Sequence, residues 1–192
     1  QKRYIGRFAG GRRIDVIPNG IAINETYQNT PDTRTPMLLF LGRLEPRKGV
    51  MNMLRVFSLV RQSHPNVELV IAGDGPMMPS VLEHVDEEGL SGVTILGMVS
   101  EKQKAMLLQQ AAVLVCPALY GESFGIILLE GMSAGVPVAG FGNPGYLSVV
   151  DGICDENFPA PGDDIQLAER ISELLGNIDY RSQVIAKGWD HS

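Results

Sequence analysis

The sequence predicts an α/β fold: a Rossmann-like, doubly wound parallel β-sheet flanked by helices. Two observations carry this prediction. Short β-branched apolar runs alternate with longer segments of helical periodicity, which is the pattern of repeated βαβ units. The runs Met37-Leu38-Leu39-Phe40-Leu41 and Leu69-Val70-Ile71-Ala72 are apolar without alternation, as expected for strands that helices cover on both faces.

Strands and helices are expected to alternate along the chain, which shows no internal repeat. The strands are expected at about 14–17, 37–41, 67–72, 93–96, 113–116 and 136–140. The helices are expected at about 49–62, 77–88, 101–111, 125–134, 163–176 and 179–188.

Local signals support the first elements in order. The first strand ends at Pro18-Asn19-Gly20, and a polar loop over 30–36 with two prolines leads into the second strand. Gly75-Pro76 places a proline where the helix at 77–88 starts. In the helix before it, apolar residues recur at helical spacing and should face the sheet, namely Val50, Met53, Leu54, Phe57 and Val60.

The second half of the chain carries similar signals. Ser100 and Gln103 form a capping box for the helix at 101–111. The run 113–116 reads as a short buried strand, so Cys116 should be a core residue. The inner face of the helix before it should consist of Ala105, Leu108 and Ala112.

Composition indicates one globular domain. The 192 residues are 44% apolar and 20% charged, enough for one sizeable core. The net charge of −6 argues against general nucleic-acid binding, so any anion site must be local. Cys116 and Cys154 have neither metal-like spacing nor a disulfide framework, which favours a reducing, intracellular setting. No apolar stretch approaches the roughly 20 residues that a membrane-spanning helix needs.

The N-terminal segment differs from the rest. Residues 1–13 contain five basic residues and begin without Met, which suggests an arm or linker from a preceding domain. Such an arm is more often solvated than a binding site. The domain proper is expected over 14–192.

The loops after the strands are where ligands bind in open α/β sheets. The loop Gly42–Gly49 carries Arg43, Arg47 and Lys48, and Arg and Lys are the usual partners of phosphate oxygens. Solvated loop charges are the alternative. The run 121–130 favours the phosphate interpretation, because it follows a buried strand and starts a helix.

That helix start has the chemistry of an anion site. The N–H groups of Phe124, Gly125 and Ile126 would point out of the helix N-terminus, where the helix dipole adds positive charge. Glu122 and Glu130 lie eight positions apart in the same run. For each Glu, a structural role and a ligand-binding role are equally supported.

Three further loops admit two interpretations each. Gly73-Asp74-Gly75 permits close backbone approach but is mostly a turn signal. Gly97-Met98-Val99, with Glu101 and Lys104 beyond it, could contact a base, although charges in a first helical turn usually serve the helix dipole. The glycine-rich run 140–145 could close on a ligand or form a plain tight turn.

These motifs together resemble a known family. Gly42-Arg43 with Lys48-Gly49, Gly73-Asp74-Gly75 and the Glu-x7-Glu run from Glu122 to Glu130 resemble the donor-binding half of family-four retaining GT-B glycosyltransferases. The resemblance covers roughly residues 14–188. Glu-Pro-Arg-Lys-Gly and Gly-Glu-Ser-Phe-Gly-Ile are most similar to the bacterial phosphatidylinositol α-mannosyltransferases.

The resemblance implies a role for each matching residue. Arg43 and Lys48, with Gly42 beside them, would bind the donor diphosphate and stabilise the charge that develops on it. The backbone around Ser123, Phe124, Gly125 and Ile126 would complete that clamp. Glu122 would bind sugar hydroxyls and Glu130 the ribose, while Val99, Glu101 and Lys104 would lie near the base. No metal or other cofactor is implied, since the sequence has no Asp-x-Asp pair.

The implied activity is retaining, metal-independent hexosyl transfer, with GDP-mannose as the plausible donor and a lipid or glycan as acceptor. The acceptor would bind an N-terminal domain that this chain lacks, so the isolated domain should catalyse little. His64, His84 and His191 lie outside every motif and should be surface residues. The implied location is cytoplasmic, with peripheral contact at the inner face of the plasma membrane only through the N-terminal domain.

Two other functions fit parts of the sequence. The chain could be a non-catalytic nucleotide-binding or regulatory module with the same fold. It could also be another doubly wound phosphate binder, such as a flavodoxin-like protein, but the P-loop pattern Gly-x4-Gly-Lys-Ser/Thr is missing.

Overall fold

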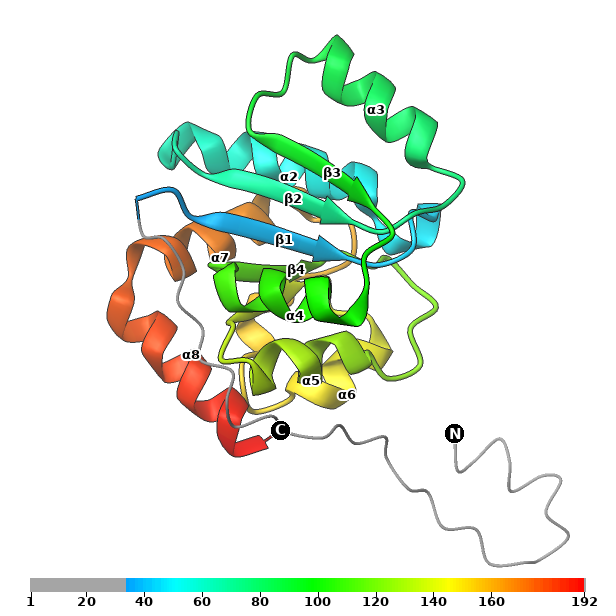
Figure 1. The fold of residues 1–192 in the computed structure, drawn as a ribbon. Coiled ribbons are helices and arrows are strands. Elements are labelled where there is room, and N and C mark those ends of the chain that lie inside the picture. Colours follow the sequence, from blue (N-terminus) through cyan, green and yellow to red (C-terminus); the bar gives the residue numbers. More distant parts are fainter. Residues whose placement is uncertain (1–33, 192) are drawn as a thin grey trace, which may run out of the picture.

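The computed structural model describes residues 34–191, and its centre is a single parallel sheet (Figure 1). The sheet has five strands in the order β3-β2-β1-β4-β5. The predicted doubly wound α/β fold is confirmed. The strand expected at 14–17 and the basic arm at 1–13 lie outside the described residues. The strands are β1 (Met37–Leu41), β2 (Glu68–Ala72), β3 (Val93–Gly97), β4 (Val113–Cys116) and β5 (Val138–Gly140).

Helices cover both faces of this sheet (Figure 1). On one face lie α2 (Val50–Ser63) and α7 (Asp164–Gly176), which contact each other along their lengths. On the other lie α4 (Glu101–Gln110) and α5 (Ile126–Ser133). The remaining helices are α3 (Met78–Glu87), α6 (Pro144–Val150), α8 (Ile178–His191) and the 3₁₀ turns η1 (Pro46–Lys48) and η2 (Asp155–Asn157).

The core follows the predicted patterns. Burial on both faces gives β4 four buried residues in a row, and Cys116 is 5% exposed. The capping box of α4 is present, because the Ser100 and Gln103 side chains each accept from the other's backbone N–H. The predicted inner face of α2 is buried in full, at Val50, Met53, Leu54, Phe57 and Val60.

Some boundaries shift, and one helix is additional to the sequence prediction. The last strand begins at Val138 instead of 136, the last helix ends at His191 instead of 188, and α6 is not predicted by the sequence. Asn143 and Pro144 were interpreted as turn signals, but Asn is also a strong N-cap and Pro suits the first helical position. Here the Asn143 side chain accepts from the Tyr146 N–H, so the same two residues start a helix.

The winding of the sheet fixes where a ligand can bind. The chain passes from β1 to β2 and β3 on one side, then returns to add β4 and β5 on the other. Because the strands are parallel, the loops that follow them meet at one edge of the sheet. The switch of direction lies between β1 and β4, the position at which such sheets bind ligands.

Candidate functional site

A cleft of about 640 Å³ opens at this carboxyl edge of the sheet. That volume lies within the range of sites for small molecules and cofactors. The loops after β1, β2 and β3 line it together with α4 and α5. The lining residues are Leu41, Gly42, Arg43, Lys48, Ala72, Gly73, Asp74, Gly75, Met98, Val99, Lys104, Ile127 and Glu130.

Backbone contacts hold the basic loop on both sides. The Leu44 N–H donates to the Asp74 carbonyl at 2.9 Å, which joins the loops after β1 and β2. On the other side, Leu119 N–H donates to the Arg47 carbonyl at 2.8 Å. Gly49 ends η1 with φ 71°, and a Cβ there would lie 1.9 Å from the Pro117 carbonyl oxygen. The basic loop is therefore fixed against the segment after β4.

An ion network joins this loop to the run that precedes α5. The Glu122 carboxylate oxygen Oε1 lies 2.6 Å from Lys48 Nζ and 3.0 Å from Arg47 Nη1. Glu45 in turn lies 3.1 Å from Arg43 Nε and 2.8 Å from Arg47 Nε. The Glu122 side chain is only 11% exposed, so this pairing is partly desolvated. Three cations against two carboxylates leave a net positive charge beside the cleft.

Glu122 is not a helix cap. The N-cap of α5 is Gly125, and no side chain caps that helix. Gly125 has φ 83°, and a Cβ there would lie 2.5 Å from Tyr146 Cδ1, so glycine is required. The backbone N–H groups of Ile126 and Ile127 lie in the first turn of α5, where N–H groups have no acceptor within the helix. Ile127, which was not among the predicted residues, lines the cleft, whereas the predicted Glu122, Ser123, Phe124, Gly125 and Ile126 do not.

A second set of ion pairs forms the opposite wall. Lys104 Nζ lies 2.8 Å from both Glu130 Oε1 and Glu101 Oε2. Burial acts to lower the pKa of Lys104, but the hydrogen bonds to Glu101 and Glu130 outweigh it, so its pKa is raised. Glu130 therefore meets a cation at the cleft wall. Glu101 is 89% exposed and does not line the cleft, whereas Val99 does.

The structure adds site residues that sequence reasoning did not select. Asp74 and Met98 line the cleft, although the first belongs to a motif interpreted as a turn. Arg47 belongs to the basic loop, but only the structure shows its contact with Glu122. Alternating charges in the run from Arg43 to Lys48 were the available signal for Glu45 and Arg47.

The glycine-rich run 140–145 serves packing. It has the Gly-x-Gly-x-x-Gly spacing of dinucleotide-binding loops, yet it follows the last strand and contributes nothing to the cleft lining. A Cβ at Gly140 would lie 2.2 Å from the Cys116 carbonyl oxygen, and one at Gly145 would lie 2.2 Å from that of Glu122. These glycines bring backbone against backbone, and Gly145 supports the segment that carries Glu122.

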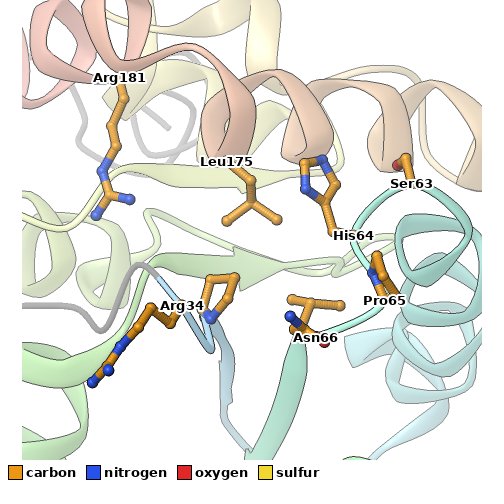
Figure 2. A pocket seen from close by; sticks show the side chains of 9 residues that line it. Arg34, Ser63, His64, Pro65, Asn66, Leu175 and Arg181 are labelled. Atoms are coloured by element: carbon orange, nitrogen blue, oxygen red, sulfur yellow. The ribbon is translucent and has the colours of Figure 1, made fainter.

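A second, smaller pocket of about 230 Å³ lies at the amino ends of β1 and β2, opposite the cleft. Figure 2 shows Arg34, Arg181 and His64 around it, with Leu175 of α7 between them. No residue predicted for the site lies there. Both His64 and His84 are partly exposed, as the sequence suggested, and the His191 side chain lies outside the described residues.

Two absences apply to residues 34–191. No group of three His, Cys, Asp or Glu side chains there could hold a metal ion. The expectation that the site works without a metal remains a prediction. No helix in this part of the chain has the length and apolar character needed to cross a membrane.

Comparison with known proteins gives a consistent picture. Residues 24–190 match the family model for glycosyl transferases group 1. A phosphatidyl-myo-inositol mannosyltransferase of Mycobacterium leprae is 34% identical over 186 residues, which cover 90% of this chain and 47% of that protein. The chain thus spans about half the length of the curated relatives it matches.

Solved structures share the fold. A mutant of Staphylococcus aureus TarM, in complex with fondaparinux, alpha-GlcNAc-glycerol and UDP, aligns with a TM-score of 0.82 at 18% identity, over 99% of this chain and 38% of that one. The C-terminal domain of a glycosyl transferase group 1 family protein from Francisella tularensis aligns with a TM-score of 0.75 at 16% identity, over 89% of this chain and 95% of that one.

Proposed function

The chain belongs to the glycosyl transferase group 1 family, and we propose that its cleft binds the nucleoside diphosphate sugar donor of a hexosyl transfer reaction. The observation that carries this proposal is the meeting of Arg43, Lys48 and the start of α5 at the switch point of the sheet. These groups supply the cations and free N–H groups that a diphosphate needs.

The remaining parts of the donor follow from the walls of the cleft. The donor ribose binds Glu130, whose carboxylate lies beside the Lys104 ammonium. The base lies against Val99 and Met98, at the end of β3, where Lys104 can contact its edge. The donor sugar is assigned to the Glu122 side, because Glu122 contacts Lys48, which is assigned to the diphosphate; Glu122 itself lies behind Lys48 and does not line the cleft.

The chemistry at this site is electrostatic. As the bond between the sugar and the diphosphate breaks, negative charge develops on the leaving diphosphate. Preorganised cations stabilise such charge, and the Lys48 side chain is only 20% exposed, whereas that of Arg43 is 73% exposed. Arg43 and Lys48 are positioned to do so without a metal ion. Glu122 binds donor sugar hydroxyls and holds the sugar in place while the bond breaks.

The finer assignment rests on the relatives. Because several are named mannosyltransferases, we propose mannose as the transferred sugar. GDP-mannose as its donor and retention of configuration are proposed from the resemblance of the sequence motifs to family-four retaining glycosyltransferases. This chain spans 47% of the M. leprae relative, so we assign the acceptor, a lipid or glycan, to an N-terminal domain outside it. The donor domain alone is then expected to bind nucleotide with little transfer activity.

Replacement of Lys48 tests the proposal. Lys48→Ala removes one charge-assisted contact with the diphosphate, which is worth about 1.5–3 kcal/mol of binding free energy. Calorimetric titration with GDP, UDP and ADP should show this loss. A matched control is Arg55→Ala, which removes a cation paired with Asp164 at 2.7 Å on α2 and α7, away from the cleft. Equal affinity in the Lys48 variant and the wild type would contradict the proposal.

Transfer activity separates an enzyme from an inactive homologue. In a protein that carries both domains, Glu122→Gln removes the charge that contacts the sugar and should lower kcat. If such a protein binds donor but transfers no sugar even without substitution, the domain is a nucleotide-binding module instead.

A further inference from the structure

The ion network contains an arginine that the proposed donor site does not use. Arg47 does not line the cleft, yet it contacts the carboxylate assigned to the sugar. Its Nη1 donates to Glu122 Oε1 at 3.0 Å and to the Gly121 carbonyl at 3.4 Å. Its Nε donates to Glu45 Oε2 at 2.8 Å. Arg47 therefore joins the basic loop to the segment before α5 through its side chain.

Two cations share one oxygen of this carboxylate. Lys48 Nζ lies 2.6 Å from Glu122 Oε1, the same atom that accepts from Arg47. Neither contact uses Oε2, and to this oxygen we assign the hydroxyl of the donor sugar. With 11% of its side chain exposed, Glu122 has little water to replace a lost cation.

The two cations differ in what else holds them. Lys48 lines the cleft, where an incoming diphosphate competes with Glu122 for its ammonium. Arg47 is anchored on its far side by Glu45, and its carbonyl accepts from the Leu119 N–H. A planar guanidinium can hold both carboxylates at once, which a lysine ammonium on a flexible stem does less well. Arg47 can therefore stay in place when Lys48 moves.

We propose that Arg47 is a positioning residue, which retains the Glu122 carboxylate while Lys48 turns to the donor diphosphate. This inference rests on the proposed function. Without Arg47, Lys48 would have to neutralise both the Glu122 carboxylate and the donor diphosphate. Binding of the diphosphate would then leave a partly buried carboxylate without a cation beside a second negative group, and such like charges repel. Arg47 acts on the donor through Glu122 and not by direct contact.

A double-mutant cycle tests whether Arg47 acts on the donor through Glu122. The chain is titrated calorimetrically with GDP, UDP and ADP, and the tightest ligand of the wild type is used for Arg47→Ala, Glu122→Gln and the double variant. Residues that act through each other show non-additive effects. We expect Arg47→Ala to weaken affinity about tenfold in the wild-type background and less than about threefold in the Glu122→Gln background.

Two further variants control for charge and folding. Arg55→Ala removes a cation of another ion pair and should change affinity less than about twofold, as for a distant independent site. Arg47→Lys keeps the charge but loses the bridge between Glu45 and Glu122, so its affinity should fall between those of the wild type and Arg47→Ala. It also keeps the inference testable if the alanine variant does not fold.

The outcomes distinguish this inference from the proposed function. Wild-type affinity in both Arg47 variants, or the same loss from Arg47→Ala in both backgrounds, overturns the positioning role while donor binding stands. Absence of binding by the wild type to all three nucleotides overturns the proposed function first, and the positioning role with it.

Discussion

Gly49→Ala should damage both the fold and the site. Gly49 links η1 to α2 with φ 71°, and a Cβ there would lie 1.9 Å from the Pro117 carbonyl oxygen. The left-handed backbone costs a residue with a side chain about 1–2 kcal/mol. Displacing a packed backbone carbonyl adds the cost of overpacking, about 1–3 kcal/mol. The free energy of unfolding should therefore fall by about 2–5 kcal/mol, from these two costs together.

A matched glycine separates the two costs. Gly152 has φ 73°, and a Cβ there meets nothing within 4 Å, so Gly152→Ala carries only the backbone cost. Urea unfolding of both variants, analysed by linear extrapolation, gives the difference. We expect Gly49→Ala to lose about 1–3 kcal/mol more than Gly152→Ala. Equal losses would refute the close contact between the basic loop and the segment after β4.

Three other predictions follow from single contacts. Asn143→Ala removes the N-cap of α6 and the hydrogen bond from its amide to the Ala118 carbonyl at 3.0 Å, so urea unfolding should show a loss of about 1–3 kcal/mol; no loss would contradict the cap. Burial raises the pKa of Cys116 and of Cys154 to about 12, so a disulfide reagent at pH 8 should modify them only after unfolding. Because the pKa of Lys104 is raised on folding, the stability difference between wild type and Lys104→Met should be constant from neutral pH up to the ordinary lysine pKa of 10.5 and shrink as pH rises through the folded value; a change between pH 6 and 9 would contradict this.

Much of the fold was predictable because its signals are local. The buried strands are continuous apolar runs, and the inner face of α2 repeats at helical spacing, so neither depends on knowing the neighbours. The capping box of α4 involves residues three positions apart. By contrast, Asn143-Pro144 fits both a turn and a helix start, and the local pattern does not decide between them.

Individual residues of the site were predictable from the sequence, but the side-chain contacts between them were not. Sequence placed Arg43 and Lys48 in the loop after a strand and Glu130 on the helix after another, and the structure brings all three to one cleft. The contact of Arg47 with Glu122 joins residues 75 positions apart, and no local pattern reports it. The pairing of Lys104 with Glu130 spans 26 positions and depends on how α4 and α5 lie on the sheet.

The most direct test of the account is a titration of the unmodified chain with GDP-mannose, GDP and guanosine. Since the proposed site binds chiefly the diphosphate, GDP-mannose and GDP should bind with release or uptake of heat, and guanosine should bind at least about tenfold more weakly, as expected when charge-assisted contacts are lost. UDP and ADP measured alongside would show the preferred base. If neither these diphosphates nor GDP-mannose bind, or if guanosine binds as tightly as GDP, the cleft is not a nucleoside diphosphate sugar site.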